Sequence, residues 1–337
     1  MGEVYLAYSP AGDPVAVKLI RGDKLDPDMR ARFEREARIA RRVVGTNRVA
    51  RFLDADPFAD RPWLAMEYVP GRTLLSCVDE DGVLPLPLVA SLGALLAEGL
   101  QAVHREGLLH RDLKPQNVIM GTEGPIIIDF GLGAFADSSD SLSPSGTLIG
   151  TVRCMPPEQA RGDSRVTSAA DVYALGTVLL YAATGHYPYE GLRWQAVAAQ
   201  ITNPAVLPDL SGVPDELQPL LGSMFADVPE KRPTVDEVSK LCGQLLEAVG
   251  RAPADARLAL IARTTEVNGS VAAEEPLSSA FERLLEMAEA DEAENFVSPL
   301  DSPPAAAEAG GAEADEQAEP VPGPAEPSRN PTARREP

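Results

Sequence analysis

The first part of the chain alternates apolar and polar residues with the period of a β-strand. Residues 4–20 alternate in this way on both sides of the turn SPAGDP, residues 9–14, which predicts a β-hairpin ending at Lys18. A charged helix is predicted from about residue 27 to residue 43, and the apolar segment WLAMEYV, residues 63–69, has strand character. We therefore expect strands and one helix in the first part of the chain.

The pattern becomes helical after this point. Apolar residues at helical spacing fill LPLVASLGALLAEGLQAVHREG, residues 86–107, and Gly107 stands at the C-cap position. Further helical patterns cover residues 169–184, 193–202 and 234–249. Two short apolar segments with polar clusters, LLHRDLKPQNVIM and GPIIIDFGLG, follow the first of these helices. We expect the chemistry of the protein where the strand-rich part meets the helix-rich part.

The composition changes again beyond Gly250. The sequence there is rich in Ala, Pro, Glu and Gly and cannot bury enough apolar surface to offset its ordering entropy, so residues 295–337 are predicted to be disordered. Residues 275–296 fit one amphipathic helix, whose apolar face would serve either packing on the folded domain or binding of a partner. Residues 251–337 hold 7 Arg against 18 Asp or Glu, which gives −11 of the total net charge of −21.

Charge and cysteine content exclude several classes of protein. A net charge of −21 argues against nucleic acid or an anionic membrane surface as the partner. The three cysteines, Cys77, Cys154 and Cys242, fit neither a CxxC metal pattern nor a disulfide framework. No signal sequence opens the chain, and no stretch approaches the ~20 consecutive apolar residues of a membrane helix. We expect a soluble, cytoplasmic protein without a transmembrane segment.

The most specific signal is a set of short motifs in a fixed order. HRDLKPQN, residues 110–117, precedes DFG, residues 129–131, while VAVK lies upstream and PPE, DVYALG and KRPT lie downstream. A lone HRD or DFG tripeptide is weak evidence, but the ordered set is specific. In these motifs the chain resembles the bacterial, eukaryotic-like (Hanks-type) serine/threonine protein kinases, from Gly2 to about Val249.

The resemblance implies an α+β, two-lobed protein-kinase-like fold. A β-rich N-lobe is expected at residues 1–69 and a helical C-lobe at residues 70–250, which together form a kinase domain of residues 1–250. Residues 251–294 are expected to be a linker that contains most of the amphipathic segment, and residues 295–337 a disordered acidic tail. ATP and Mg²⁺ would bind in the cleft between the lobes.

The resemblance also implies which residues carry phosphoryl transfer. Asp112 corresponds to the catalytic aspartate that orients the substrate hydroxyl, and Lys114 to the lysine that contacts the γ-phosphate in the serine/threonine class. Asn117 and Asp129 correspond to the ligands of Mg²⁺, or of Mn²⁺ in its place, and oxygen ligands suit such a hard cation. This reaction asks the protein mainly for positioning and charge stabilisation, which these side chains supply.

Nucleotide binding is assigned mainly to the N-lobe. Lys18 of VAVK matches the lysine that holds the α- and β-phosphates, and Glu36 is expected to pair with it from the predicted helix, with Glu34 as the alternative. The other expected nucleotide-binding residues are Gly2 and Val4 of the glycine-rich loop, Ala16 over the adenine, the gatekeeper Met66, and the hinge residues Glu67 and Val69.

Regulation is assigned to the activation loop. Arg111 precedes the catalytic aspartate. In the family, an arginine at this position implies an activation loop that binds to the arginine once the loop is phosphorylated. Thr147 is the first expected autophosphorylation site, with Ser145 and Thr151 as further candidates. Thr151 also matches a threonine that bonds the catalytic aspartate and Lys114.

Structural roles are expected for a last group of residues. Asp171 should hold the backbone of the catalytic loop, and Glu158 should form a buried ion pair with Arg232. His110 is interpreted as core support for the same loop, and His104 as a surface or packing residue.

The glycine-rich loop departs from the family pattern. G-x-G-x-x-G-x-V closes over the phosphates of ATP, and Gly2 and Val4 correspond to only its third glycine and its valine. Two interpretations stay open. Either the first strand and the first two glycines lie upstream of Met1, or the protein is a pseudokinase or regulatory scaffold that binds ATP weakly. The presence of Lys18 together with the HRD and DFG aspartates argues against the second.

We therefore expect an ATP-dependent serine/threonine protein kinase that acts in signal transduction. It would transfer the γ-phosphoryl group to Ser or Thr hydroxyls of proteins and phosphorylate its own activation loop, in trans through self-association. A small-molecule kinase of the same fold is disfavoured by the long activation loop, by PPE and by Lys114. The expected partners are protein substrates and not nucleic acid.

Overall fold

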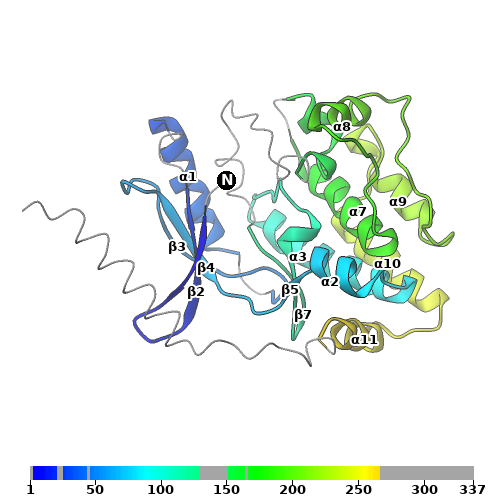
Figure 1. The fold of residues 1–337 in the computed structure, drawn as a ribbon, viewed down its shortest axis with the longest axis horizontal. Helices are drawn as coiled ribbons and strands as arrows, with labels where there is room; N and C mark the ends of the chain where they lie inside the picture. The colour runs from blue at the N-terminus through cyan, green and yellow to red at the C-terminus, as the bar shows by residue number, and fades with distance from the viewer. Residues whose placement is uncertain (1–2, 21–25, 44–45, 130–150, 164–165, 266–337) are drawn as a thin grey trace, which may run out of the picture. The chain divides into compact units, whose positions relative to one another are not determined.

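The structure contains a β-rich N-lobe and a helical C-lobe, as the sequence predicts (Figure 1). This computed structural model describes residues 3–20, 26–43, 46–129, 151–163 and 166–265. All of these residues fall within one compact unit by internal contacts, Met1–Val271. The predicted disordered tail and the amphipathic segment lie outside the described residues.

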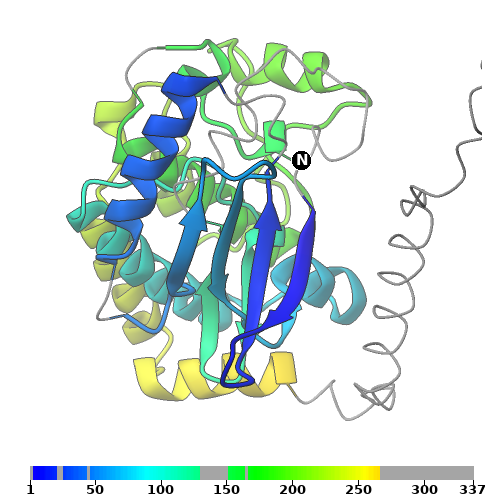
Figure 2. The same cartoon turned by 90° about the vertical axis from the view of Figure 1, so that its left-hand side faces the viewer.

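The N-lobe is built on a four-stranded antiparallel sheet (Figure 2). The predicted hairpin is confirmed, and its turn is held by Ser9, whose Oγ accepts hydrogen bonds from the N–H groups of Ala11 at 3.2 Å and Asp13 at 3.1 Å. Lys18 lies on the second strand, opposite Leu64, and is therefore fixed by a strand with neighbours on both sides. In the order β1-β2-β4-β3 the strands are β1 (Val4–Tyr8), β2 (Pro14–Leu19), β4 (Trp63–Glu67) and β3 (Phe52–Asp56).

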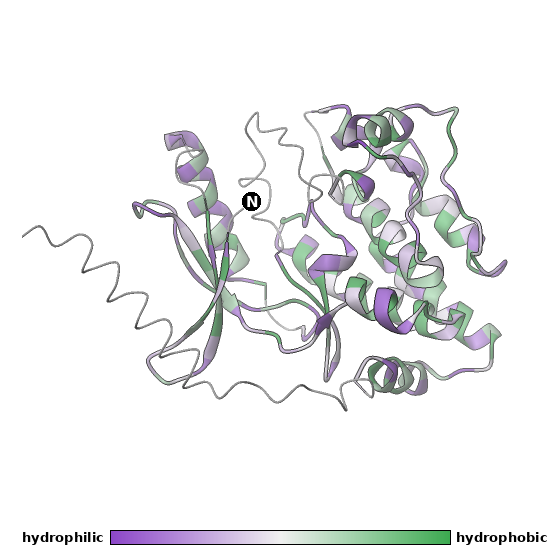
Figure 3. Ribbon diagram, viewed as in Figure 1, coloured by the Kyte–Doolittle hydropathy of each residue, from purple (hydrophilic) through white to green (hydrophobic). Residues whose placement is uncertain are grey.

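Helix α1 (Pro27–Ala40) is the single helix expected in this part of the chain, and it packs on β3. It begins with a capped N-terminus, because the side chain of Asp26 accepts a hydrogen bond from the N–H of Met29 at 2.7 Å. Phe33 and Ala37 are buried between charged neighbours, and Figure 3 shows both colours of the hydropathy scale on this helix. One apolar face therefore holds α1 against the sheet.

The C-lobe consists mainly of helices around a central one, α7, which is buried from Ala170 to Ala183. Helix α3, predicted at residues 86–107, packs on α7 and on α10. The elements of the C-lobe are β5 (Arg72–Thr73), α2 (Leu74–Asp81), α3 (Leu86–Arg105), the 3-10 turn η2 (Pro115–Asn117), β6 (Val118–Gly121), β7 (Gly124–Ile127), α6 (Pro157–Ala160), α7 (Ser168–Thr184), α8 (Trp194–Ile201), α9 (Gln218–Met224), η3 (Pro229–Lys231), α10 (Val235–Ala248) and α11 (Pro253–Thr265).

Helix α3 is long and apolar enough to cross a membrane by length and composition. However, 67 % of this stretch is buried inside the protein, against α7, α10 and α11. Packing within the C-lobe therefore accounts for its apolar surface.

A small sheet, β5-β6-β7, lies where the chain passes from one lobe to the other. β6 begins directly after Asn117, and β7 leads to Asp129. Gly71 precedes β5 with a φ of 146°, and a Cβ there would stand 2.5 Å from the carbonyl oxygen of Met120 in β6. Only glycine allows so close an approach. This sheet therefore ties the exit of the N-lobe to the strands next to both expected metal ligands.

Helix α11 falls in residues 251–294, the segment predicted to be a linker. It buries Ala256, Leu260 and Thr264 and packs on α3, β6 and β7. Close packing therefore continues past residue 250.

Glu158 and Arg232 form the buried ion pair that the sequence predicts. Arg232 donates to both carboxylate oxygens of Glu158, at 2.7 and 2.8 Å, and also to the backbone carbonyl groups of Ala169 and Ala226. Its guanidinium carbon lies 5.1 Å from the ring centre of Tyr173. This bidentate geometry offsets the cost of removing both charges from water.

Replacing Glu158 with Gln should lower the free energy of unfolding by roughly 3 to 5 kcal/mol, because the charge of Arg232 then stays buried without a counter-ion. Chemical denaturation measures this loss, and the double variant Glu158→Gln, Arg232→Met should recover part of it. The control is Glu190→Gln, which breaks the exposed pair with Arg153 and should cost at most about 1 kcal/mol. Equal losses in the two single variants would contradict the prediction.

Candidate active site

The HRD segment is held by a buried carboxylate. Asp171 of α7 is fully buried and accepts hydrogen bonds from the backbone N–H groups of His110 and Arg111, both at 2.9 Å. Arg111 has a φ of 64°, a left-handed conformation that is unfavourable for a residue with a side chain. The two hydrogen bonds therefore hold a strained turn, which is the geometry expected for Asp171.

His104, interpreted from the sequence as a surface or packing residue, also contacts Asp171. Its Nε2 lies 2.6 Å from Oδ2 of Asp171. Burial alone would raise the pKa of Asp171, but the hydrogen bond and the charge of His104, with smaller effects of His110, bring it below its usual value. The available signal was the position of His104 in the last turn of the helix that leads into HRDLKPQN.

The structure brings three of the expected site residues together around a fourth, Asp112. Nζ of Lys114 donates to Oδ2 of Asp112 at 2.7 Å and to Oγ1 of Thr151 at 2.8 Å. Nδ2 of Asn117 donates to the backbone carbonyl of Asp112 at 2.8 Å. Lys114 and Asn117 are both buried. A carboxylate, an ammonium group and an amide therefore converge at one point of the loop.

Lys18 and Asp129 meet between the two lobes. Nζ of Lys18 donates to Oδ2 of Asp129 at 2.8 Å. The backbone N–H of Ile128 donates to the carbonyl of Asn117 at 2.9 Å, so Asp129 and Asn117 lie on adjacent segments of the chain. Asp129 has a φ of 60°, a second left-handed residue at the site.

The donor set fits a hard divalent cation. The amide nitrogen of Asn117 donates to the carbonyl of Asp112, so the amide oxygen of Asn117 points away from that carbonyl. Asp129 supplies carboxylate oxygens. Among the residues that the structure describes, no group of three or more His, Cys, Asp and Glu could enclose a metal by itself. Two oxygen ligands suit Mg²⁺, because this ion keeps waters and phosphate oxygens in its coordination shell.

Glu36 does not make the expected ion pair with Lys18. Its Oε1 lies 3.3 Å from Nε of Arg32 and 3.6 Å from Nη1 of Arg111. Burial raises the pKa of Glu36, against the opposing effects of Arg111 and Arg32. The reason for the altered pairing is the local charge, because arginines surround Glu36 while Lys18 is bound to Asp129. The predicted pairing is wrong for this conformation.

Glu34 does not supply the missing partner either. It pairs with Arg38 at 2.9 Å on an exposed part of the helix. Glu36 instead lines a cavity of about 230 Å³ together with Arg32, Arg35 and Arg111. The arrangement gathers three guanidinium groups and one carboxylate between α1 and the HRD segment.

Comparison with known proteins shows the family of this chain. The protein kinase domain family matches residues 1–241. The chain belongs to this family. The probable serine/threonine-protein kinase PkwA of Thermomonospora curvata is 44 % identical over 239 residues, 71 % of this chain and 32 % of that protein. The serine/threonine-protein kinase AfsK of Streptomyces coelicolor is 43 % identical over 234 residues, 69 % of this chain and 29 % of that protein.

These curated kinases are longer than the present chain, which spans about a third of their length. Among solved structures, the kinase domain of Mycobacterium tuberculosis PknI matches with a TM-score of 0.58 and 26 % identity, over 73 % of this chain and 91 % of that one. The bacterial kinase resemblance seen in the motifs thus extends to the fold.

Five of the expected nucleotide-binding residues of the kinase N-lobe, Val4, Ala16, Lys18, Met66 and Glu67, lie on one sheet. Ala16 of β2 is opposite Met66 of β4, and Val4 of β1 is opposite Lys18. Glu67 ends β4, and Val69 follows in the connection to β5. Gly2 lies outside the described residues.

The expected phosphorylation sites of the kinase separate into two groups. Thr151 is described, and its hydroxyl accepts the predicted hydrogen bond from Lys114, while the contacts of the described residues do not include the predicted bond between Thr151 and Asp112. Ser145 and Thr147 lie outside the described residues.

Lowering the pH should destabilise the kinase domain through His110. This histidine is fully buried and its pKa is lowered by that burial, so the folded state keeps it neutral while the unfolded state takes up a proton below about pH 6.5. The free energy of unfolding should therefore be highest above about pH 6.5 and fall below it, with a limiting slope of about 1.4 kcal/mol per pH unit.

Denaturation curves on both sides of this pH measure the slope. The variant His110→Phe should lose this contribution, while His186→Gln, at a half-buried histidine of the C-lobe, should keep it. An unchanged slope in His110→Phe would assign the effect to other groups.

Proposed function

We propose that the chain transfers the γ-phosphoryl group of ATP to Ser or Thr hydroxyls of protein substrates. The contact of Lys114 with both Asp112 and Thr151, at 2.7 and 2.8 Å, carries this proposal. It sets an ammonium group beside the carboxylate that would accept the hydroxyl proton, where the acceptor and the transferred group have to meet. The names of the relatives, which are serine/threonine-protein kinases, support the same class of substrate.

The charged groups of the site support a division of roles. Asp112 would orient the substrate hydroxyl and take its proton, while Lys114 would offset negative charge on the transferred group. Lys18 would bind the α- and β-phosphates and would then have to share or leave its contact with Asp129. Mg²⁺ held by Asn117 and Asp129 would add positive charge at the phosphates. Mn²⁺ has similar ligand preferences and would serve the same residues.

We also infer that Gly2 and Val4 supply only the last part of a glycine-rich phosphate lid. Val4 lies on β1, the edge strand of the four-stranded sheet, and is 60 % exposed. Tyr5, Leu6 and Tyr8 of the same strand are exposed as well. An extended segment along this edge would cover these side chains and complete the lid. The contacts around Lys114 bring together residues that phosphoryl transfer would need. They therefore do not support the pseudokinase alternative.

A cytoplasmic location stays a prediction. All three cysteines, Cys77, Cys154 and Cys242, are free and buried, which suits a reducing compartment. Burial raises the pKa of each thiol, so none has the character of a reactive cysteine.

Asp112→Asn should lower phosphate transfer by about 10²- to 10⁴-fold, because the variant cannot take the hydroxyl proton. Incorporation of labelled γ-phosphate into peptides that carry only Ser, only Thr or only Tyr measures both the activity and the acceptor class. Lys18→Met should raise the KM for ATP, and Asp60→Asn, in the exposed turn between β3 and β4, should behave as wild type. Equal background incorporation by folded wild type and Asp112→Asn would instead favour the pseudokinase.

Phosphorylation of the activation loop is proposed to act through Arg111. A phosphate group carries up to two charges and forms strong hydrogen bonds with guanidinium groups, and Arg32, Arg35 and Arg111 line one cavity. A phosphorylated Thr147 or Ser145 bound there would compete with Glu36 for Arg111. Phosphorylation would then free the Glu36 carboxylate for Lys18.

Preincubation with ATP and Mg²⁺ should therefore raise the initial rate of peptide phosphorylation. Arg111→Gln should remove this activation, and the joint variant Ser145→Ala, Thr147→Ala should do the same. Ser138→Ala in the same loop is the control and should keep it. Full activation of Arg111→Gln would show that the loop does not act through this arginine.

A further inference from the structure

We propose that helix α11 holds in place the segments that form the nucleotide site. It does so through two arginines, Arg257 and Arg263. The helix lies beyond residues 1–241, the part that the kinase family matches. Its central residue Leu260 is fully buried in the main hydrophobic core, so α11 belongs to the folded C-lobe. The inference rests on the proposed function, because it concerns the site where ATP would bind.

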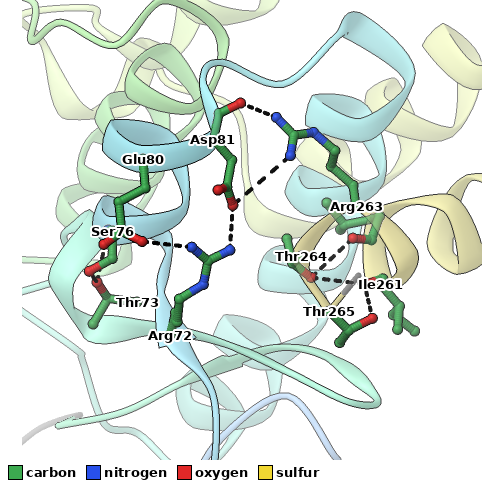
Figure 4. Close-up of polar contacts among 10 residues, drawn as sticks. Arg72, Thr73, Ser76, Glu80, Asp81, Ile261, Arg263, Thr264 and Thr265 are labelled. Carbon is green, nitrogen blue, oxygen red and sulfur yellow. Dashed lines mark hydrogen bonds and ion pairs between the residues drawn. The ribbon is translucent and has the colours of Figure 1, made fainter. Parts of the chain in front are cut away.

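Arg263 connects α11 to Asp81 at the end of α2, and through Asp81 to Arg72 (Figure 4). It donates to the backbone carbonyl of Asp81 and lies 4.0 Å from the carboxylate of the same residue. That carboxylate also accepts a hydrogen bond from Arg72, whose other terminal nitrogen bonds Glu80 at 2.9 Å. The Asp81 side chain is only 8 % exposed, so its interactions are little weakened by water. One carboxylate therefore joins α11, α2 and β5.

Arg72 stands between the expected hinge and a strand of the metal site. It follows Gly71, three residues after Val69, and pairs with Met120 of β6. β6 begins directly after Asn117. A displacement of Arg72 would therefore move both the segment expected to hold the adenine and the strand next to a metal ligand.

Arg257 connects α11 to the turn between β6 and β7. Its Nη2 donates to the carbonyl of Glu123 at 2.9 Å, and Nη1 of Arg48 donates to the same carbonyl at 2.9 Å. Arg48 is 5 % exposed, and Glu98 lies 3.8 Å from its Nε. The carbonyl of Glu123 and the carboxylate of Glu98 hold the guanidinium groups of Arg48 and Arg257 close together, although these two positive groups repel each other. The turn is therefore fixed from both sides.

Arg48 belongs to the connection between α1 and β3, which runs along β7. Its carbonyl accepts a hydrogen bond from the N–H of Ile127 at 2.8 Å, and the N–H of Ala50 donates to the carbonyl of Ile127 at 2.9 Å. Ile127 ends β7, two residues before Asp129. Through Arg257, α11 therefore supports the strand that leads to the second expected metal ligand.

The variant Arg263→Ala separates positioning of the nucleotide site from simple stabilisation. Rates of Ser/Thr peptide phosphorylation by the full chain are measured against ATP and against peptide, together with thermal unfolding. The KM for ATP should rise about fivefold, at the low end of typical couplings between sites, while the KM for peptide stays unchanged. Arg263→Lys keeps the charge and should restore part of the ATP response.

Leu258→Ala is the matched control, because Leu258 lies on the same helix and is 65 % exposed. It should behave as wild type in every measurement. An equal rise in the two KM values for Arg263→Ala, or a loss of rate that follows only the unfolded fraction, would overturn the proposal.

Amide hydrogen exchange tests the same proposal without activity. Arg263→Ala should speed exchange in residues 67–73 and 118–121, and Arg257→Gln in residues 46–51 and 124–129, with α7 unchanged as the internal reference. If the wild type transfers no phosphate, the proposed function fails, and exchange still decides whether α11 positions these segments. Unchanged exchange in both variants would overturn the proposal.

Discussion

A single buried carboxylate holds the catalytic loop in its strained conformation. Removing a carboxylate from water costs several kcal/mol when it is unpaired. Asp171 offsets this cost with the backbone N–H groups of His110 and Arg111 and with the side chain of His104. α7, which carries Asp171, is buried along nearly its whole length, so the core of the C-lobe sets the position of this carboxylate. The loop therefore takes its position from a helix that is itself buried in the core.

The site consists of positively and negatively charged side chains that lie in pairs. Lys114 lies against Asp112, and Lys18 lies against Asp129, each at hydrogen-bond distance. In each pair the two opposite charges offset each other. A phosphate group entering the site meets ammonium groups that can rotate toward it, since lysine carries its charge on a flexible chain.

The motifs predicted the fold and most of the local contacts. These contacts lie either within one short segment or between segments whose relative position is set by the kinase fold. The hairpin, the Glu158–Arg232 pair and the bond of Lys114 to Thr151 are examples. The partner of Glu36 could not be predicted, because it depends on how α1 sits relative to the C-lobe. The arginines that pair with Glu36 come from α1 itself and from the HRD segment, and the motifs do not give the position of one of these segments relative to the other. Helix α11 was missed because its buried positions include Ala and Thr, which give a weak hydrophobic period.

Helix α1 is followed by a segment, around Arg48, that is bound to the C-lobe. The carbonyl of Arg48 accepts a hydrogen bond from the N–H of Ile127 in β7, and the N–H of Ala50 donates to the carbonyl of Ile127. Because Arg257 of α11 donates to the same carbonyl group as Arg48, α11 supports the attachment of this segment to the C-lobe. In the regulation that we propose, Glu36 chooses between arginine and lysine partners by local electrostatic competition, and one added phosphate on the activation loop would compete with it for Arg111.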